Sequence, residues 1–464
     1  MIRRSRAATT AVALLLTTAF TREAGAQTPP AAATPAPPTT EELEQRIRIL
    51  ERKLELADEA AAEKAKTTPT SLVGADGFGW KSADGAFQLK LRGLLQTDGR
   101  FYVGDDRKPV SDTLLVRRAR PIVEAVFFKD FELRLMPDFG DGKSQLLDAS
   151  LDWRVSPWLT LRAGKFKVPI GLEALAADAH LPFVERGAAS AVAPVRDVGV
   201  QASGEPRGGR FSWTVGVFNG QADGVTGDGD SDDDKEIAGR LLFRPFRRPG
   251  AEAAAIDLTL GVAFSAGKAS GTTSATGLPS YRTAGNQTFF SFRSDSTAAG
   301  TAIADGTRRR IAPQASLYVG PLGITAEWTR SEQETARGTT RATLANDGWQ
   351  VALAWVATGE RMSERGVAPR RPFALGKGHG ALALAARAGV LTVDSGAFPF
   401  FADPTRSARR AMNLGASANW ILNRNAKLVL DYERTAFDGG DKLGTTAVDR
   451  ETEQVLLGRI QLTF

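Results

Sequence analysis

Arginines recur on the polar face of successive alternating segments in this 464-residue chain. They are Arg92, Arg100, Arg118, Arg120, Arg134, Arg162, Arg240, Arg308 and Arg310. Arginine stays charged and presents five fixed N–H donors, so a row of guanidinium groups along a wet passage can hand an anion from one position to the next. The alternative is that acidic residues on the same faces pair with the arginines and hold a wall together. These acids are Glu124, Glu132, Asp138, Asp148, Asp152, Glu327 and Glu453.

Residues 87–102, FQLKLRGLLQTDGRFY, show what positions such side chains. Phe87, Leu89 and Leu91 share one parity, whereas Lys90 and Arg92 share the other. Period two predicts an extended strand with one apolar face and one face toward water. Further segments follow the same rule at 113–126, 131–139, 146–154, 159–168, 196–203, 210–218, 236–244, 255–265, 308–320, 322–331, 348–358, 379–391, 409–421, 426–436 and 451–464. The sequence therefore predicts sixteen strands with no helix between them.

The connections between these strands alternate in length. Short turns are expected near 128–130, 156–157, 205–209, 320–321 and 423–425. Long loops are expected near 103–112, 169–195, 219–235, 266–307, 332–347, 392–408 and 437–450. Outer-membrane barrels have this asymmetry, with short periplasmic turns and long outer loops. The pattern predicts an all-β fold, a 16-stranded antiparallel transmembrane β-barrel. Residues 359–378 are long where a short turn is expected, so either that turn is enlarged or the strand count is wrong by a pair.

The chain ends in IQLTF, with Leu462 and Phe464 on the same parity. A barrel removes its sheet edges by pairing its last strand with its first. We therefore expect Leu462 and Phe464 to serve barrel closure and assembly.

The first 85 residues differ from the rest. Residues 1–26 combine early arginines, an apolar run and the small residues Ala24 and Ala26, which predicts a secretory signal peptide. Residues 27–40 are rich in Pro, Ala and Thr and predict a linker. Residues 41–66 have apolar positions at heptad spacing, which predicts a short periplasmic helix, either an oligomeric coiled coil or a helix docked on another surface. Residues 67–85 connect this helix to the barrel at 86–464.

Several other chemistries have little support. The absence of cysteine excludes thiol catalysis and Cys-ligated zinc. Neither histidine, His180 or His379, has a serine at partner spacing, so we expect no enzyme activity. The acidic run at 228–236 has Asp233 where a calcium-binding EF-hand loop needs glycine, and we interpret it as a solvated loop. We expect no cofactor, no metal site and no nucleic-acid partner.

A set of short motifs carries a family resemblance. They are LVRRAR (115–120), FFKDFELRLMPDF (127–139), LRAGKFKVPIGLE (161–173), VER (184–186), PVRDVGV (194–200), GVFNG (216–220), AGRL (238–241), DGTRRRIAPQ (305–314) and TGE (358–360). With these motifs, residues 85–464 resemble the phosphate-selective porin O/P family of bacterial outer-membrane channels. The resemblance implies a homotrimer in the outer membrane of a Gram-negative cell, a third outer loop that folds inward, and arginines that lead to a lysine cluster selecting phosphate or pyrophosphate.

The segment 169–195 holds the third outer position in the chain's own order of loops. Lys165, Lys167, Arg186 and Arg196 flank it or lie in it, and are the candidates for a constriction. Twelve lysines follow Lys66 against thirty-seven arginines, which departs from a lysine-based phosphate site. The sequence predicts a passive channel for small anions such as phosphate or polyphosphate-like solutes. A general diffusion porin without phosphate specificity and an outer-membrane structural tether are the alternatives.

Overall fold

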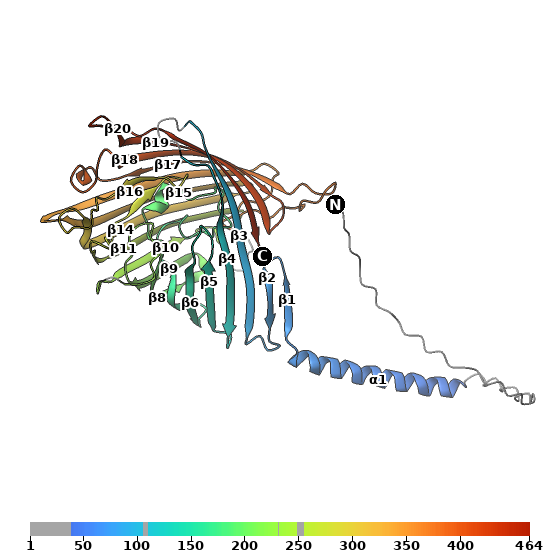
Figure 1. The fold of residues 1–464 in the computed structure, drawn as a ribbon. Coiled ribbons are helices and arrows are strands. Elements are labelled where there is room, and N and C mark those ends of the chain that lie inside the picture. Colours follow the sequence, from blue (N-terminus) through green and yellow to red (C-terminus); the bar gives the residue numbers. More distant parts are fainter. Residues whose placement is uncertain (1–38, 105–109, 231, 248–254) are drawn as a thin grey trace, which may run out of the picture. The chain divides into compact units, whose positions relative to one another are not determined.

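The computed structural model describes residues 39–104, 110–230, 232–247 and 255–464, and its main feature is a closed antiparallel β-barrel (Figure 1). Sixteen strands form the ring: β3 (Gln88–Tyr102), β4 (Thr113–Phe127), β5 (Phe131–Asp138), β6 (Gln145–Ser156), β7 (Leu159–Lys167), β8 (Arg196–Gly204), β9 (Phe211–Phe218), β10 (Glu236–Phe243), β11 (Ile256–Ser270), β14 (Ala302–Val319), β15 (Leu322–Arg337), β16 (Thr340–Val356), β17 (Ala381–Thr392), β18 (Ala408–Ile421), β19 (Ala426–Leu443) and β21 (Glu453–Thr463). The predicted fold and strand count are confirmed.

Closure joins the two ends of the barrel sequence. Strand β21 pairs with β3 from Val455 opposite Tyr102 to Thr463 opposite Leu94. Beyond that register, the Gly93 amide donates to the Phe464 carbonyl at 2.9 Å, and the Phe464 amide donates back to Gly93 at 3.1 Å. The last residue of the chain therefore extends the ladder that closes the barrel.

Two short strands precede the ring, within the predicted connector. Strands β1 (Thr70–Gly74) and β2 (Gly77–Lys81) form a hairpin, and β2 pairs with the start of β3. It occupies the part of the β3 edge that β21 does not reach. The hairpin thus covers backbone groups that would otherwise be left unpaired at the seam.

The N-terminal helix α1 spans Thr40–Thr67. Its start is a capping box, in which the Glu42 amide donates to the Thr39 hydroxyl at 3.3 Å and the Thr39 amide donates to the Glu42 carboxylate at 3.2 Å. Leu50 and Leu54 of the heptad seam are both 64% exposed. Among the described helices, none has both the length and the apolar character needed to cross a membrane. The predicted signal peptide (1–26) and most of the linker (27–38) lie outside the described residues.

The strands keep the alternation of the sequence, with apolar side chains facing outward. On β16, Trp349, Val351 and Trp355 are each more than 40% exposed, whereas the intervening Gln350 is 7% exposed and Ala354 is 8% exposed. A water-soluble protein would expose the polar set instead. An apolar exterior around a polar interior is the arrangement that lets a barrel sit in lipid.

One predicted loop is wrong and another is shorter than expected. Residues 332–347 were expected to be a loop, but β15 continues to Arg337 and β16 begins at Thr340, with a tight turn between them. Outward-facing residues here are charged, such as Arg330 and Glu332, which form an ion pair at 3.0 Å. Beyond the apolar belt both faces are polar, so the alternation loses its hydrophobic signal. The predicted loop at 437–450 is shorter than expected for the same reason. It contains the end of β19, which continues to Leu443, and a further strand, β20 (Thr446–Asp449).

The connection between β16 and β17 runs through residues 357–380. It is an enlarged turn at the end of the barrel that otherwise has short turns, and the count of sixteen strands stands. The loop between β11 and β14 contains a small two-stranded sheet, β12 (Ser280–Arg282) and β13 (Thr288–Ser291).

We expect Phe464→Ala to lower the folded yield. The Phe464 ring lies against Phe78 of β2, with ring centroids 5.8 Å apart, and covers Gly93 so closely that a Cβ there would lie 2.5 Å from the ring. Removing the ring should destabilise the seam by about 1–3 kcal/mol, read as a smaller heat-resistant fraction on gels. Gly93→Val should act in the same direction. Leu443→Ala, a change to a side chain that is 77% exposed, is the control. Equal yields for all variants would contradict a role in closure.

Candidate functional site

The segment between β7 and β8, residues 168–195, turns into the barrel and is called the inward loop below. It contains the short helix α2 (Ala188–Ala191). The backbone amides of Leu172 and Glu173 donate to Glu327 on β15 at 2.6 and 3.3 Å. On the far wall, the Val184 amide donates to Asp431 on β19. Strands β15 and β19 each lie six strands away from β7, where the loop begins, so the inward loop crosses the lumen.

Asp178 is the first anchor of the inward loop. Its carboxylate lies 3.3 Å from Arg118 and 2.6 Å from Arg186, and it also pairs with Arg120. Arg118 and Arg120 come from β4, whereas Arg186 belongs to the loop itself. Burial opposes ionisation of Asp178, but Arg118, Arg186 and Arg120 outweigh it and hold its pKa well below the usual range. The carboxylate therefore stays charged and fixes the loop to β4.

Glu185 is the second anchor. It accepts from the Arg117 Nε at 2.5 Å, and it lies 3.7 Å from Arg118 and 3.5 Å from Arg100. Burial opposes ionisation here too, and the charges of Arg117 and Arg118 prevail, so the pKa of Glu185 is lowered. Its backbone carbonyl accepts from Arg387 of β17 at 2.7 Å. Asp178 and Glu185 thus bind the loop to β3, β4 and β17.

The anchoring network is the ion-pair cluster around Asp178 and Glu185, and it contains more arginines than carboxylates; Glu173, Glu327 and Asp431 hold the loop through its backbone amides and are not part of this cluster. Its ion pairs connect five arginines with three carboxylates, which leaves two positive charges. The arginines are Arg100, Arg117, Arg118, Arg120 and Arg186; the carboxylates are Asp138, Asp178 and Glu185. Lys167 adds a further cation beside the loop, where its Nζ donates to the carbonyls of Ala174 and Ala176, both at 2.8 Å.

Three more predicted pathway arginines lie on the wall formed by β3, β5 and β7. Arg92 pairs with Glu124 at 3.5 Å, Arg134 pairs with Glu124 and with Asp148, and Arg162 pairs with Asp152 at 2.6 Å. These side chains are between 34% and 40% exposed, more than the arginines around the inward loop. They alternate with acids on neighbouring strands, so this part of the wall is close to neutral.

The remaining predicted arginines support loops and strands. Arg310 is fully buried between Asp223 and Glu236, at 2.6 and 2.5 Å. Arg308 donates to the Gly277 carbonyl at 2.6 Å, and Arg240 donates to Gln314 at 2.7 Å.

Of the four constriction candidates, two contact the inward loop directly. Arg186 and Lys167 hold its backbone, since both donate to the carbonyl of Ala176. Arg196 pairs with Asp148 at 2.7 Å, and Lys165 pairs with Asp228 in the acidic segment that the sequence places in a solvated loop. The last two fix the wall and a neighbouring loop around the constriction.

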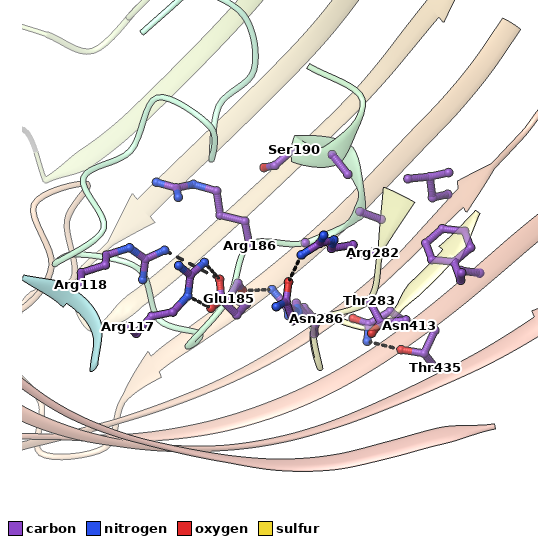
Figure 2. A pocket seen from close by; sticks show the side chains of 18 residues that line it. Arg117, Arg118, Glu185, Arg186, Ser190, Arg282, Thr283, Asn286, Asn413 and Thr435 are labelled. Carbon is purple, nitrogen blue, oxygen red and sulfur yellow. Dashed lines mark hydrogen bonds and ion pairs between the residues drawn. The ribbon is translucent and has the colours of Figure 1, made fainter. Parts of the chain in front are cut away.

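A chamber of about 200 Å3 lies between the inward loop and the β12–β13 hairpin (Figure 2). Arg117, Arg186 and Arg387 line it from the wall and the inward loop, and Arg282 lines it from the hairpin. Figure 2 shows Arg117 and Arg118 reaching Glu185, and Arg282 directed toward Asn286. Glu185 is the only carboxylate among the described residues that line this chamber.

The family comparison decides the identity. A family model described as phosphate-selective porin O and P matches residues 87–464, which is most of the chain. The chain belongs to this family. It is therefore an outer-membrane porin, and no curated protein sequence matches it significantly.

Solved structures agree with the fold. The anion-selective porin from Comamonas acidovorans has a TM-score of 0.51 at 11% identity, covering 82% of this chain and 100% of its own. The outer membrane channel DcaP of Acinetobacter baumannii has the same TM-score and identity, covering 83% of this chain and 99% of its own. OprB of Pseudomonas putida has a TM-score of 0.50 at 12% identity, with 82% and 95% covered.

Sequence reasoning missed two residues of the porin's chamber. Arg117 lies on the apolar parity of β4, but the register between β3 and β4 shifts so that Gln96 faces Arg118 and the next residue, Thr97, faces Val116. Arg117 is the extra residue of this bulge, which lets it reach Glu185. Arg282 lies in a long loop, where parity carries no information. The adjacent arginines in LVRRAR are the only local hint of the bulge.

We expect Asp178→Asn to loosen the inward loop of the porin. The change leaves three arginines without their shared carboxylate, and removing one partner from a buried ionic network costs about 3–5 kcal/mol. Single-channel recordings in planar bilayers should show a larger and noisier conductance. Asp438→Asn, which breaks an exposed pair with Arg409, is the matched control. An unchanged conductance in Asp178→Asn would show that the loop is held by other contacts.

Asp178 and Glu185 themselves should stay ionised in mild acid, because the pKa of each carboxylate is lowered. A carboxylate whose folded pKa is lowered contributes stability that is present above about pH 4, its pKa in the unfolded chain, and that is lost only as the pH falls through the lowered value. The conductance difference between the wild type and Asp178→Asn should therefore stay constant from pH 8 to pH 5. A difference that disappears within this range would mean that Asp178 becomes protonated there.

Proposed function

We propose that this porin is a passive channel with a preference for small anions, including phosphate and polyphosphate-like solutes. The observation that carries the proposal is the positive excess of the anchoring network, in which five arginines meet three carboxylates where the inward loop crosses the lumen. Lys167 lies beside this network. An anion that passes the inward loop therefore meets the guanidinium groups of the anchoring network and the Lys167 side chain. The neighbouring carboxylates compensate only part of their positive charge.

The distance between a charged side chain and the passing ion explains why the residues around the inward loop would set the anion preference. At physiological salt, charges are screened over about 8 Å, so only cations close to a narrow section act on a passing ion. The wall arginines Arg92, Arg134 and Arg162 are paired with acids and are more exposed to the lumen. Their net field on an ion is therefore weak. The inward loop both narrows the path and holds the uncompensated charge.

Phosphate specificity rests on the family alone, and a general anion channel without it is the second candidate. Among the described residues, two lysines donate hydrogen bonds to the inward loop. Lys167 donates to the carbonyls of Ala174 and Ala176, and Lys427 donates to the Leu181 carbonyl. A cluster of lysines is therefore not the device that would select phosphate here. Inhibition of chloride current by added phosphate distinguishes the two candidates.

We propose further that the porin is a homotrimer in outer-membrane lipid, with helix α1 in the periplasm. The exposed heptad seam and the family support the trimer, and the apolar exterior supports the lipid contact. A structural tether would use the same helix, but would predict that solute uptake does not change when the barrel is blocked.

Charge-neutralising variants test the anion preference. We expect the double variant Lys167→Met, Arg186→Gln to move the reversal potential in a KCl gradient toward the cation side. The double variant Arg134→Gln, Arg162→Gln should move it less, because each of those arginines has a wall carboxylate beside it. Arg406→Gln with Arg409→Gln should leave it nearly unchanged, because Arg406 lies in the loop before β18 and Arg409 is exposed at the start of β18. Equal shifts in all three double variants would show that total charge, rather than the inward loop, sets selectivity.

The trimer has its own test. Deleting residues 41–66 should weaken assembly without abolishing it, because the barrel walls are expected to supply most of the contact. Light scattering of the protein in mild detergent gives the mass directly. A monomeric barrel with the helix intact would refute the trimer.

A further inference from the structure

The β12–β13 hairpin spans the mouth of the barrel above the inward loop. It arises between β11 and β14, yet its tip contacts the closure seam across the ring. The Tyr102 hydroxyl of β3 donates to the Gly285 carbonyl at 2.5 Å, and Gln287 donates to the same hydroxyl at 2.9 Å. The Thr283 hydroxyl donates to Glu453 of β21 at 3.0 Å. The lumen is thus crossed twice, and the chamber lies between the two crossings.

One side of this chamber is apolar. Phe289 and Leu391 line it and are each 2% exposed, and Ala411 lines it at 6%. They belong to a hydrophobic cluster that joins the hairpin to β17, β18 and helix α2. Inorganic phosphate gains nothing from contact with such side chains, because all its oxygens require polar partners. The apolar side favours a solute with a hydrocarbon part.

The other side of the chamber offers donors for one anionic group. Arg282 is exposed. Its guanidinium group donates a hydrogen bond to the Asn286 side-chain oxygen at 3.3 Å, and no carboxylate among the described residues forms an ion pair with it. Arg118 and Arg387 line the same side, but their guanidinium groups pair with Asp178, Glu185 and Glu433. Guanidinium groups bind carboxylates through paired, charge-assisted hydrogen bonds. Among the described arginines that line the chamber, Arg282 is therefore the one whose guanidinium group is not paired with a carboxylate.

The size of the chamber limits the solute. A cavity of about 150 Å3 lined by apolar side chains accommodates benzene. The chamber, at about 200 Å3, has room for one such ring together with a carboxylate.

We propose that the chamber between the inward loop and the β12–β13 hairpin is a binding site for small organic carboxylates with one apolar end. Arg282 binds the carboxylate, and the side formed by Phe289, Leu391 and Ala411 covers the hydrocarbon. This deepens the anion-channel function proposed above and rests on it. Such solutes would occupy the channel in a saturable manner, whereas chloride would pass without occupying the chamber for long.

Three probes separate the two halves of the site. Benzoate carries both the charge and the ring, acetate carries only the charge, and benzyl alcohol carries only the ring. In planar bilayers with the full-length protein, benzoate should interrupt the KCl current at concentrations about tenfold below acetate, and benzyl alcohol and inorganic phosphate should be weaker than benzoate. Equal potency of benzoate, acetate and phosphate would overturn the proposal, as would the absence of any block by benzoate.

Arg282→Gln locates the effect. It should weaken the block by benzoate about tenfold, measured relative to the variant's own open-channel KCl current, while the block by acetate changes less than the block by benzoate. Arg406→Gln removes an equally exposed outer-loop arginine outside the chamber and should not alter the block. Equal block in wild type and Arg282→Gln would overturn the assignment. The reversal potential of the same channels reports the anion preference separately, so an anion-selective channel that benzoate does not block refutes only the chamber site.

Discussion

The ion pairs of Asp178 and Glu185 determine the form of the lumen. These two carboxylates of the inward loop contact Arg117, Arg118 and Arg120 of β4. Each carboxylate compensates several guanidinium groups at once, and the desolvation of charges inside the barrel is offset by multiple contacts. Holding the loop across the lumen therefore requires a cluster of arginines, and three carboxylates do not neutralise five of them. The arginines that anchor the inward loop are therefore also those on which the proposed anion preference depends.

The barrel itself was predictable because it obeys a local rule. Each strand repeats the two-residue alternation, and closure follows from matching the ends, so sixteen strands and the pairing of β21 with β3 were accessible from the sequence. The rule fails where the physical environment changes. Above the apolar belt the outward residues of β15 and β16 are charged, and residues 332–347 were therefore expected to be a loop. The sequence signal reports lipid contact as well as strand geometry.

The candidate site was accessible only in part, because its contacts join segments far apart in the chain. Parity identified Arg118 as inward-facing, but its pairing with Asp178 depends on the path of the inward loop. Arg117 faces inward through a bulge that no alternation rule contains. Arg282 lies in a hairpin whose position is set by Tyr102 and Glu453, on the opposite side of the ring. Such partners are determined by tertiary structure rather than by local pattern.

Two kinds of contact determine how charge is distributed along the lumen: ion pairs between neighbouring strands, and hydrogen bonds to backbone carbonyls of the inward loop. Where neighbouring strands face open lumen, Arg134 lies beside Glu124 and Asp148, and cross-strand pairing keeps the wall near neutrality. Where a loop crosses the lumen, its backbone carbonyls accept from Lys167 and, beside the Asp178 carboxylate, from Arg186. A carbonyl satisfies a donor without cancelling its charge. Backbone acceptors therefore leave part of the positive charge beside the inward loop without a compensating acid, and the proposed anion preference depends on this charge.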